Sequence, residues 1–346
     1  MSLIATVIPT KSHSLAGGAI LAPMSGITDA GLRRIAQRFG AARVVSEMVA
    51  CDQLILRDAE ACLRAEGEGI STHVIQIAGC EAYWMAEGAK AAEAAGAAVI
   101  DINMGCPAKK VTNGWSGSAL MRDLDHACHL IEATVAAVKV PVTLKTRLGW
   151  DHASLNAPEL ARRAESLGIT MVTIHGRTRQ QFYKGTADWA AVRAVRDAMP
   201  LPLVVNGDIV DTPTAQHALA LSGADMVMIG RAAMGRPWLL GEVSSALRGE
   251  AWEAPTAAEK CAAAIEHYQW LLTSMGREKG LRHARKHIGA YLEEASRFGS
   301  GAATAMMQEM LTCDEPETVI AGLGAAFSEA GNSQVTHESG ALRQVA

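Results

Sequence analysis

The sequence predicts an α/β protein in which eight parallel strands and their helices close into a barrel, followed by a small helical domain. Apolar residues make up 49% of the chain and aromatic residues only 4%, and alanine is abundant, which favours packed helices over a β-sandwich. Short runs of β-branched and aliphatic residues alternate with longer alanine-rich segments, as expected of parallel βα units. The 346 residues suit a barrel of roughly 250 residues with about 100 more.

The predicted strands are short apolar runs. Several, such as VIDI and MVMI, are nearly continuously apolar, which is typical of strands buried on both faces. In chain order the eight runs are Ala19 to Pro23, Arg43 to Ser46, His73 to Ile77, Ala98 to Ile102, Val142 to Lys145, Met171 to Ile174, Leu203 to Val205, and Asp225 to Ile229.

Each run ends in a glycine or in a residue with reactive or polar chemistry. The carboxyl ends of the strands of a closed parallel barrel converge on one face, where such barrels keep their active sites. The residues that this rule brings together are Met24 and Ser25, Glu47, Gln76, Asn103, Lys145, His175, Asn206, and Gly230 with Arg231.

An open, doubly wound sheet is the main structural alternative, because it also alternates strands and helices. No GxGxxG motif follows the first run, however. The segment from Gly230 to Pro237 has Arg236 and Pro237 where a phosphate-binding loop needs lysine and then serine or threonine. The sequence therefore favours the barrel.

The strand pattern stops after about Gly249, and Thr256 to Met275 and Gly280 to Arg297 are predicted helices. We therefore divide the chain into a catalytic barrel (residues 1–250) and a helical domain (residues 251–330). Residues 331–346 are polar and without periodicity, which predicts a disordered tail.

Composition excludes several classes of protein. The seven cysteines form no CxxC pair, which argues against a disulfide framework or a zinc ribbon and favours a reducing compartment. The first residues do not form a signal peptide and no 18-residue apolar run occurs, so we expect a cytoplasmic protein without a membrane span. The net charge of −4 gives no general argument for binding nucleic acid.

One local patch is basic. Between residues 276 and 290 five cations accompany a single acid, Glu278: Arg277, Lys279, Arg282, Arg285 and Lys286. Charge alone favours an ordinary solvated helix face, since such faces are common. A surface that contacts phosphates is the alternative.

Two loops form a predicted phosphate site. Asn206, Gly207 and Asp208 follow the seventh strand, and Gly230 and Arg231 follow the eighth. Barrels commonly bind phosphate at this pair of loops, where glycines let backbone N–H groups approach closely and an arginine adds charge. Two ordinary strand-to-helix turns are the alternative.

Three further positions are candidates for chemistry. Lys145 interrupts an apolar strand, so its burial calls for an anionic partner, although a lysine that reaches solvent explains it equally well. Cys106 lies in the loop NMGCP, where a mostly protonated thiol can donate a proton or act as a nucleophile. His175 shares the loop HGRTR with Arg177 and Arg179, which favours ligand contact.

His283 and His287 lie one helical turn apart. Because no carboxylate or cysteine partner is evident beside them in the sequence, no metal site is predicted.

The chain from Ala19 to about Leu240 resembles the tRNA-dihydrouridine synthase family. The motifs APMSGITD, VIQIAG, DINMGCPAKKV, LKTRLGW, IHGRTR, NGDI and MIGRAAMGRPW occur in the family's order, and GLRHARKHIGAYL resembles the stretch with which the family grips tRNA. The resemblance implies a barrel that binds FMN and uses NADPH to reduce D-loop uridines of tRNA.

The resemblance also implies residue roles. Cys106 would be the catalytic acid. The flavin ring, ribityl chain and phosphate would be held by Pro23, Met24, Ser25, Gln76, Lys145, His175, Asn206, Gly207, Asp208, Gly230 and Arg231. The tRNA would be contacted by Asn103, Lys109, Arg147, Arg177, Arg179, Arg282, Arg285 and Lys286. We expect a monomer.

One loop departs from the family pattern: Trp115 and Ser116 stand where relatives usually have an arginine-containing, glycine-rich loop. This affects the expected position of the uridine or the closure of the loop, not cofactor binding. The alternatives are a small-molecule FMN reductase of the dihydroorotate dehydrogenase kind, an aldolase-like enzyme with a Schiff base on Lys145, and an RNA-binding protein without activity.

Overall fold

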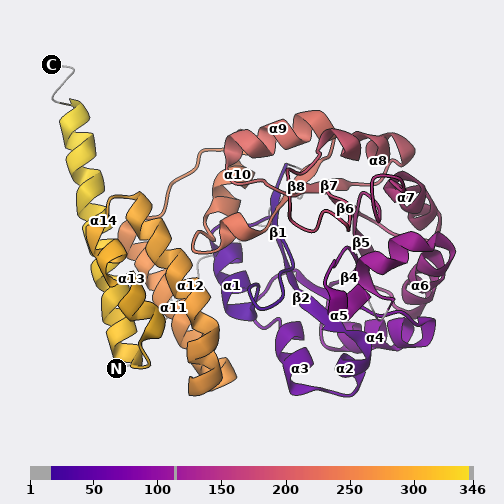
Figure 1. Cartoon of the computed structure of the whole chain (residues 1–346), viewed down its shortest axis with the longest axis horizontal. Coiled ribbons are helices and arrows are strands. Elements are labelled where there is room, and N and C mark those ends of the chain that lie inside the picture. The colour runs from indigo at the N-terminus through magenta and orange to yellow at the C-terminus, as the bar shows by residue number, and fades with distance from the viewer. Residues whose placement is uncertain (1–16, 113–114, 343–346) are drawn as a thin grey trace.

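The structure is a computed structural model that describes residues 17–112 and 115–342. Its strands form one closed barrel in the chain order β1 to β8, and all neighbouring pairs are parallel, including β1 with β8 (Figure 1). The predicted α/β barrel is confirmed, and the open sheet is excluded.

All eight predicted runs form strands, with ends that shift by a few residues. The strands are β1 Ala19–Leu21, β2 Arg43–Ala50, β3 His73–Ala78, β4 Val99–Met104, β5 Val142–Arg147, β6 Val172–His175, β7 Leu203–Asn206 and β8 Met226–Ile229.

Helices surround the barrel. They are α1 Ala30–Arg38, α2 Cys51–Ile55, α3 Ala59–Ala65, α4 Ala82–Ala94, α5 Lys109–Thr112, α6 Leu124–Ala137, α7 Ala157–Ser166, α8 Arg193–Ala198, α9 Thr212–Ser222 and α10 Leu239–Arg248. Short 3-10 turns span Gly117–Arg122, Ala190–Val192 and Arg231–Ala233.

The side chains inside the barrel change from apolar to polar along the strands. Ile20, Val74 and Val99 belong to a buried cluster that is separate from the larger one between strands and helices. Gln76 and Asp101 come two residues later on the same strands and are also buried. Because side chains alternate along a strand, they point the same way as the valines. Apolar packing therefore fills the amino-terminal half, and polar groups meet at the carboxyl-terminal face.

Four helices form the C-terminal domain: α11 Ala257–Met275, α12 Arg277–Arg297, α13 Gly301–Thr312 and α14 Pro316–Leu342. They stack beside α1 of the barrel (Figure 1). Thr256 and Glu259 form a capping box that starts α11, so the predicted start of this helix is correct to one residue. None of the helices in the described ranges is apolar enough over a sufficient length to cross a membrane.

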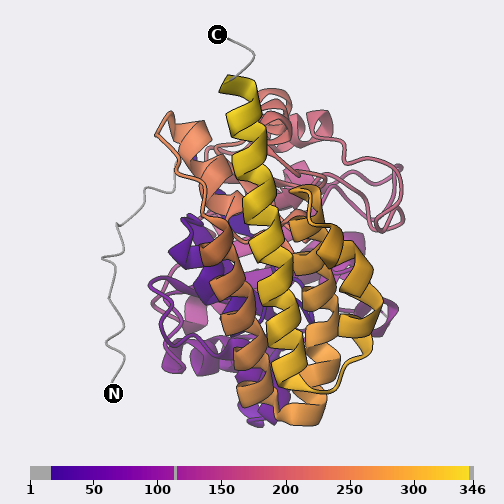
Figure 2. The same cartoon turned by 90° about the vertical axis from the view of Figure 1, so that its left-hand side faces the viewer.

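The last helix is longer than the sequence suggests. The sequence predicts a disordered tail from residue 331, but α14 continues to Leu342 along the outer side of the domain (Figure 2). No proline follows Pro316, so no residue in this segment is unable to continue a helix. Residues 343–346 lie outside the described part of the chain.

The barrel and the helical domain meet at a close seam. Trp238, just before α10, belongs to the apolar core of the helical domain together with residues such as Tyr268 and Leu292. Gly235 has φ +68°, and a Cβ there would overlap the carbonyl oxygen of Ala290 on α12. Only glycine allows so close an approach, so the backbones of the two parts are in direct contact at this seam.

Candidate active site

A cavity of about 920 Å³ lies at the carboxyl-terminal face of the barrel and extends to α12. It brings together most residues that the sequence predicts for the site, namely Pro23, Met24, Ser25, Gln76, Asn103, Cys106, Lys145, Arg147, His175, Arg177, Asn206, Gly207, Asp208, Gly230 and Arg231. Lys109, Arg179, Arg282, Arg285 and Lys286 do not line it. The barrel register explains the grouping, because Asn103 pairs with Lys145 and His175 with Asn206 on adjacent strands.

Lys145 is a buried cation at the centre of this face. Its Nζ donates to Oδ1 of Asn206 at 3.1 Å, and no ion pair with a carboxylate is recorded for it in the described ranges. Burial, followed by the nearby Arg147 guanidinium, lowers the pKa of Lys145 to about 8. An anionic or electron-rich group in the cavity would offset this cost.

His175 faces the same cavity. Its ring is buried, and that burial, together with surrounding cations led by Arg147, lowers its pKa well below the ordinary value. The imidazole is therefore neutral at physiological pH, so it offers a hydrogen-bond donor and an acceptor rather than a charge.

A chain of hydrogen bonds crosses three adjacent strands. The hydroxyl of Thr143 donates to Oδ1 of Asp101 at 2.6 Å. Nε2 of Gln76 donates to Oδ2 of Asp101 at 2.7 Å, and Nδ2 of Asn103 donates to Oε1 of Gln76 at 2.7 Å. Sequence reasoning did not select Asp101. The lone carboxylate in the apolar run VIDI is the signal that points to it, because a buried charge needs partners.

The same chain positions Cys106. Oδ1 of Asn103 accepts the backbone N–H of Cys106 at 3.0 Å, and the Ser118 hydroxyl donates to the Cys106 carbonyl at 2.8 Å. Gly117 has φ +59°, and a Cβ there would lie 2.9 Å from that carbonyl. Cys106 is partly exposed and lines the cavity, so hydrogen bonds fix the loop that carries this residue at the cavity.

Comparison with known proteins identifies the family. A sequence model of the dihydrouridine synthase family matches residues 20–320. The chain belongs to this family. It is 53% identical to a probable tRNA-dihydrouridine synthase of Rhizobium leguminosarum bv. phaseoli, over 88% of this chain and 93% of the relative. It is 42% identical to tRNA-dihydrouridine synthase B of Xanthomonas axonopodis pv. citri, over 92% of this chain and 98% of the relative.

The predicted resemblance is therefore confirmed, and the protein is an oxidoreductase. Among solved structures, morphinone reductase covers 70% of this chain and 88% of its own length, at 14% identity and a TM-score of 0.48. That likeness is too distant to support any inference about the enzyme's chemistry.

The two loops that the sequence predicts for phosphate carry one carboxylate, Asp208, and one exposed guanidinium, Arg231. Asp208 accepts hydrogen bonds from Arg177 at 3.0 and 2.6 Å and from the backbone N–H of Ala187 at 2.7 Å. These contacts hold the loop after β7 against the segment from Arg177 to Ala187. Arg231 is 67% exposed and 3.8 Å from Asp208, so its guanidinium is available to an anion.

Two arginines predicted to contact tRNA, Arg147 and Arg177, are buried and line the cavity. Arg147 donates to the carbonyls of Gly105, Thr178 and Phe182. Arg177 donates to Asp208 and to the carbonyls of Lys184 and Gly185.

Their guanidinium groups hold loops together and form the wall of the cavity. The residues beside them in the sequence, Thr146 and Leu148 for Arg147 and Gly176 and Thr178 for Arg177, gave no sign of this burial.

The basic patch on α12 is partly neutralised. Arg285 pairs with Asp314 at 3.1 Å, Arg277 with Glu315 at 3.2 Å, and Lys279 with Glu60 at 3.3 Å. Arg282 and Lys286 are exposed on the same helix. Because these ion pairs are themselves exposed, they contribute little and can be exchanged for phosphate contacts.

Aromatic rings and arginines alternate beside the cavity mouth. Arg122 lies 5.2 Å from the ring centre of Trp115 and 5.0 Å from that of Trp150, and Arg179 lies 4.7 Å from the Trp150 ring. Trp115 has an exposed ring and φ +55°. Trp115, which departs from the family pattern, is thus held in a stack of alternating arginines and aromatic rings. Sequence spacing gave no signal for this stack.

His283 and His287 do have a carboxylate partner. Asp29 at the start of α1 lies next to both rings, which removes the reason why the sequence predicted no metal site.

Proposed function

We propose that the protein is an FMN-dependent tRNA-dihydrouridine synthase that uses NADPH to reduce D-loop uridines. One observation carries the proposal: the Cys106 thiol, the buried Lys145 ammonium and the two glycine-containing loops border a single cavity, in a chain of the dihydrouridine synthase family.

The cations and glycines that line the cavity support FMN as the cofactor. Gly230 leaves the space of a side chain open, since a Cβ there would meet nothing closer than the Met24 sulfur at 3.4 Å. We place the phosphate against the backbone of Gly207 and Gly230, with Arg231 supplying charge. Lys145, whose ammonium donates to Asn206 and forms no ion pair with a carboxylate among the described residues, would lie beside the electron-rich ring. His175 and Gln76 would contribute hydrogen bonds to the ring or the ribityl chain.

When bound, FMN would supply the hydride that adds to C6 of uracil. The contribution of the chain is the proton: Cys106 donates it to C5, while Asn103 and Ser118 hold the loop that positions the thiol. Lys145 stabilises negative charge that develops in the cavity, since a buried ammonium acts strongly in a low dielectric. Asn103 retains one N–H that can reach the uracil edge.

The uridine must leave its stacked position to reach the cavity, because stacking covers both reacting carbons. Exposed cations on α12, Arg282 and Lys286, together with Arg285 once released from Asp314, would hold the tRNA backbone. Lys109 and Arg179 lie closer to the loop of Cys106 and would contact the flipped nucleotide. Arg147 and Arg177 serve as cavity wall in this scheme.

The proposal is tested with the purified protein and tRNA from a strain that lacks dihydrouridine synthases. We expect release of FMN on acid denaturation, and formation of dihydrouridine in the D-loop on addition of NADPH, measured by mass spectrometry of nuclease fragments. Release of FAD, or reconstituted protein that binds no flavin, would contradict the cofactor assignment. Reduction of free orotate to dihydroorotate by NADPH, with tRNA left unchanged, would favour a small-molecule reductase.

A further inference from the structure

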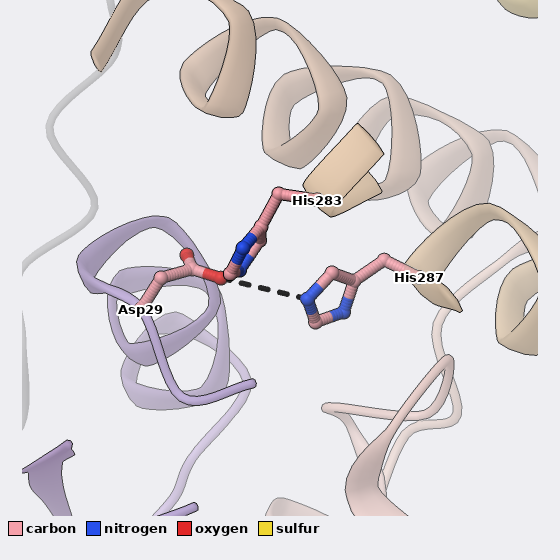
Figure 3. A group of neighbouring side chains, drawn as sticks. All are labelled: Asp29, His283 and His287. Atoms are coloured by element: carbon pink, nitrogen blue, oxygen red, sulfur yellow. Dashed lines mark ion pairs between the residues drawn. The ribbon is translucent and has the colours of Figure 1, made fainter. Parts of the chain in front are cut away.

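A cluster of histidines and one carboxylate joins the barrel to the helical domain. Asp29 caps the start of α1, whereas His283 and His287 lie one turn apart on α12. One potential ligand atom from each residue lies within 4.8 Å of the other two. Figure 3 shows the three side chains directed toward a common point, one from the barrel and two from the helix.

The histidines lack ordinary partners. His287 is only 2% exposed, yet within the described chain neither of its ring nitrogens makes a hydrogen bond, and Nε2 of His283 is also buried without one. Buried polar groups are nearly always hydrogen-bonded, so unpaired nitrogens call for an explanation. Three such nitrogens on two neighbouring rings, beside one carboxylate, point to a shared ligand.

The distances suit a metal ion better than a direct hydrogen bond. Nε2 of His287 lies 3.7 Å from Oδ2 of Asp29, which is too long for a hydrogen bond. Two ligands of a tetrahedral zinc ion with bonds near about 2.0–2.1 Å stand roughly 3.3–3.5 Å apart. A shift of a few tenths of an ångström would bring these two atoms to that separation.

The carboxylate is oriented for such a role. Oδ1 of Asp29 accepts the N–H of Leu32 at 3.0 Å, and Nε2 of His267 lies 3.2 Å from Oδ1 and 3.1 Å from Oδ2. His267 in turn contacts the Tyr291 hydroxyl through Nδ1 at 3.1 Å. Outer partners of this kind fix the orientation of metal-binding side chains.

The three side chains offer the donor atoms that a metal ion needs. Asp29 supplies carboxylate oxygens, and His283 and His287 supply ring nitrogens whose electron pairs can bind a cation.

We propose that Asp29, His283 and His287 form a binding site for a divalent transition metal, Zn²⁺ by the chemistry of its ligands, which ties the barrel to the helical domain. Two imidazoles favour Zn²⁺ over Mg²⁺ or Ca²⁺, which prefer oxygen ligands only. Water takes the fourth position. Lys286 lies near His283 and opposes the ion electrostatically, while Glu47, which lies near Lys286, offsets this charge.

The test is zinc binding to untagged, full-length protein that has been treated with a chelator and then freed of it. We expect one Zn²⁺ per chain by elemental analysis after dialysis, saturable binding in competition with a chromophoric chelator, and a higher Tm with zinc. His283→Gln and His287→Gln should each weaken binding more than about 100-fold, and His267→Gln about 10- to 100-fold. His129→Gln, an exposed histidine on α6, is the matched control and should bind as the parent does.

Parent protein that is folded by circular dichroism but binds no zinc would overturn the proposal. So would zinc binding that persists unchanged in His283→Gln. Because His283 is only partly buried, this variant is expected to fold even if His287→Gln does not. Zinc content is measured without FMN, NADPH or tRNA, so its outcome is independent of the proposed catalytic function.

Discussion

The cations at the carboxyl-terminal face of the barrel, here called the barrel mouth, and the cations on α12 differ in burial and in the partners that they bind. Arg147 and Arg177 are buried, and fixed carbonyls or Asp208 accept from their guanidinium groups. Arg277 and Arg285 are exposed and pair with acids on the loop before α14. Removing the charged partner of a buried cation lowers the free energy of unfolding strongly, whereas removing the partner of an exposed cation changes it little. The first group therefore builds a fixed cavity, and the second remains free to exchange partners.

The largest expected effect is on the rate of uridine reduction and comes from a residue at the barrel mouth. Cys106→Ala removes the proposed proton donor, so reduction of uridine should fall about 10²- to 10⁴-fold. Flavin content, reduction of the flavin by NADPH and tRNA affinity should be retained, because Cys106 contacts none of the α12 cations. Rates are measured by dihydrouridine formation under single turnover. Cys128→Ala, at a thiol away from the cavity, is the control, and normal turnover by Cys106→Ala would remove the thiol from the mechanism.

The next effect concerns stability. Asp208→Asn leaves Arg177, which is only 2% exposed, without its charged partner. We expect a loss of about 3 kcal/mol, the lower end for buried pairs because Asp208 is partly exposed. Urea unfolding without added cofactor measures it. A change below about 1 kcal/mol would show that the carbonyl contacts alone hold the guanidinium.

The third test removes three cations of α12. The triple variant Arg282→Gln, Arg285→Gln, Lys286→Gln should weaken tRNA binding, and the slope of log K against log salt should shrink by up to about one unit per lost contact. Flavin content and NADPH oxidation should be unchanged, since none of the three residues borders the cavity. An unaltered salt slope would make the patch an ordinary solvated helix face.

The smallest expected effect is the exposed counterpart of Asp208→Asn. Glu315→Gln removes the partner of Arg277, whose side chain is 60% exposed. Stability to urea should change by less than about 1 kcal/mol, and tRNA affinity should hold or rise slightly as the arginine is freed. If Glu315→Gln lowered the free energy of unfolding as much as Asp208→Asn does, the two groups of cations would not differ in their contribution to stability.

The sequence predicts the barrel well because strand periodicity and polar strand ends are local signals. The eight strands and the grouping of Lys145, His175 and Asn206 follow from them. The burial of Arg147 and Arg177 does not, because it depends on carbonyls from loops that the sequence cannot orient. Asp29 was missed as a partner of His283 for the same reason: the two lie at opposite ends of the chain, and only the packing of α12 on the barrel brings them together.

The seam between Gly235 and Ala290 has a consequence for how the molecule loses its structure. Trp238 belongs to the core of the helical domain although it precedes α10, and Arg38 of α1 pairs with Glu266 of α11 at 2.8 Å. Unfolding of the C-terminal helices would expose Trp238 to solvent. Unfolding of the barrel would remove the surface against which α12 packs. The chain should therefore behave as one cooperative unit, with no stable fragment obtained by cutting between residues 250 and 256.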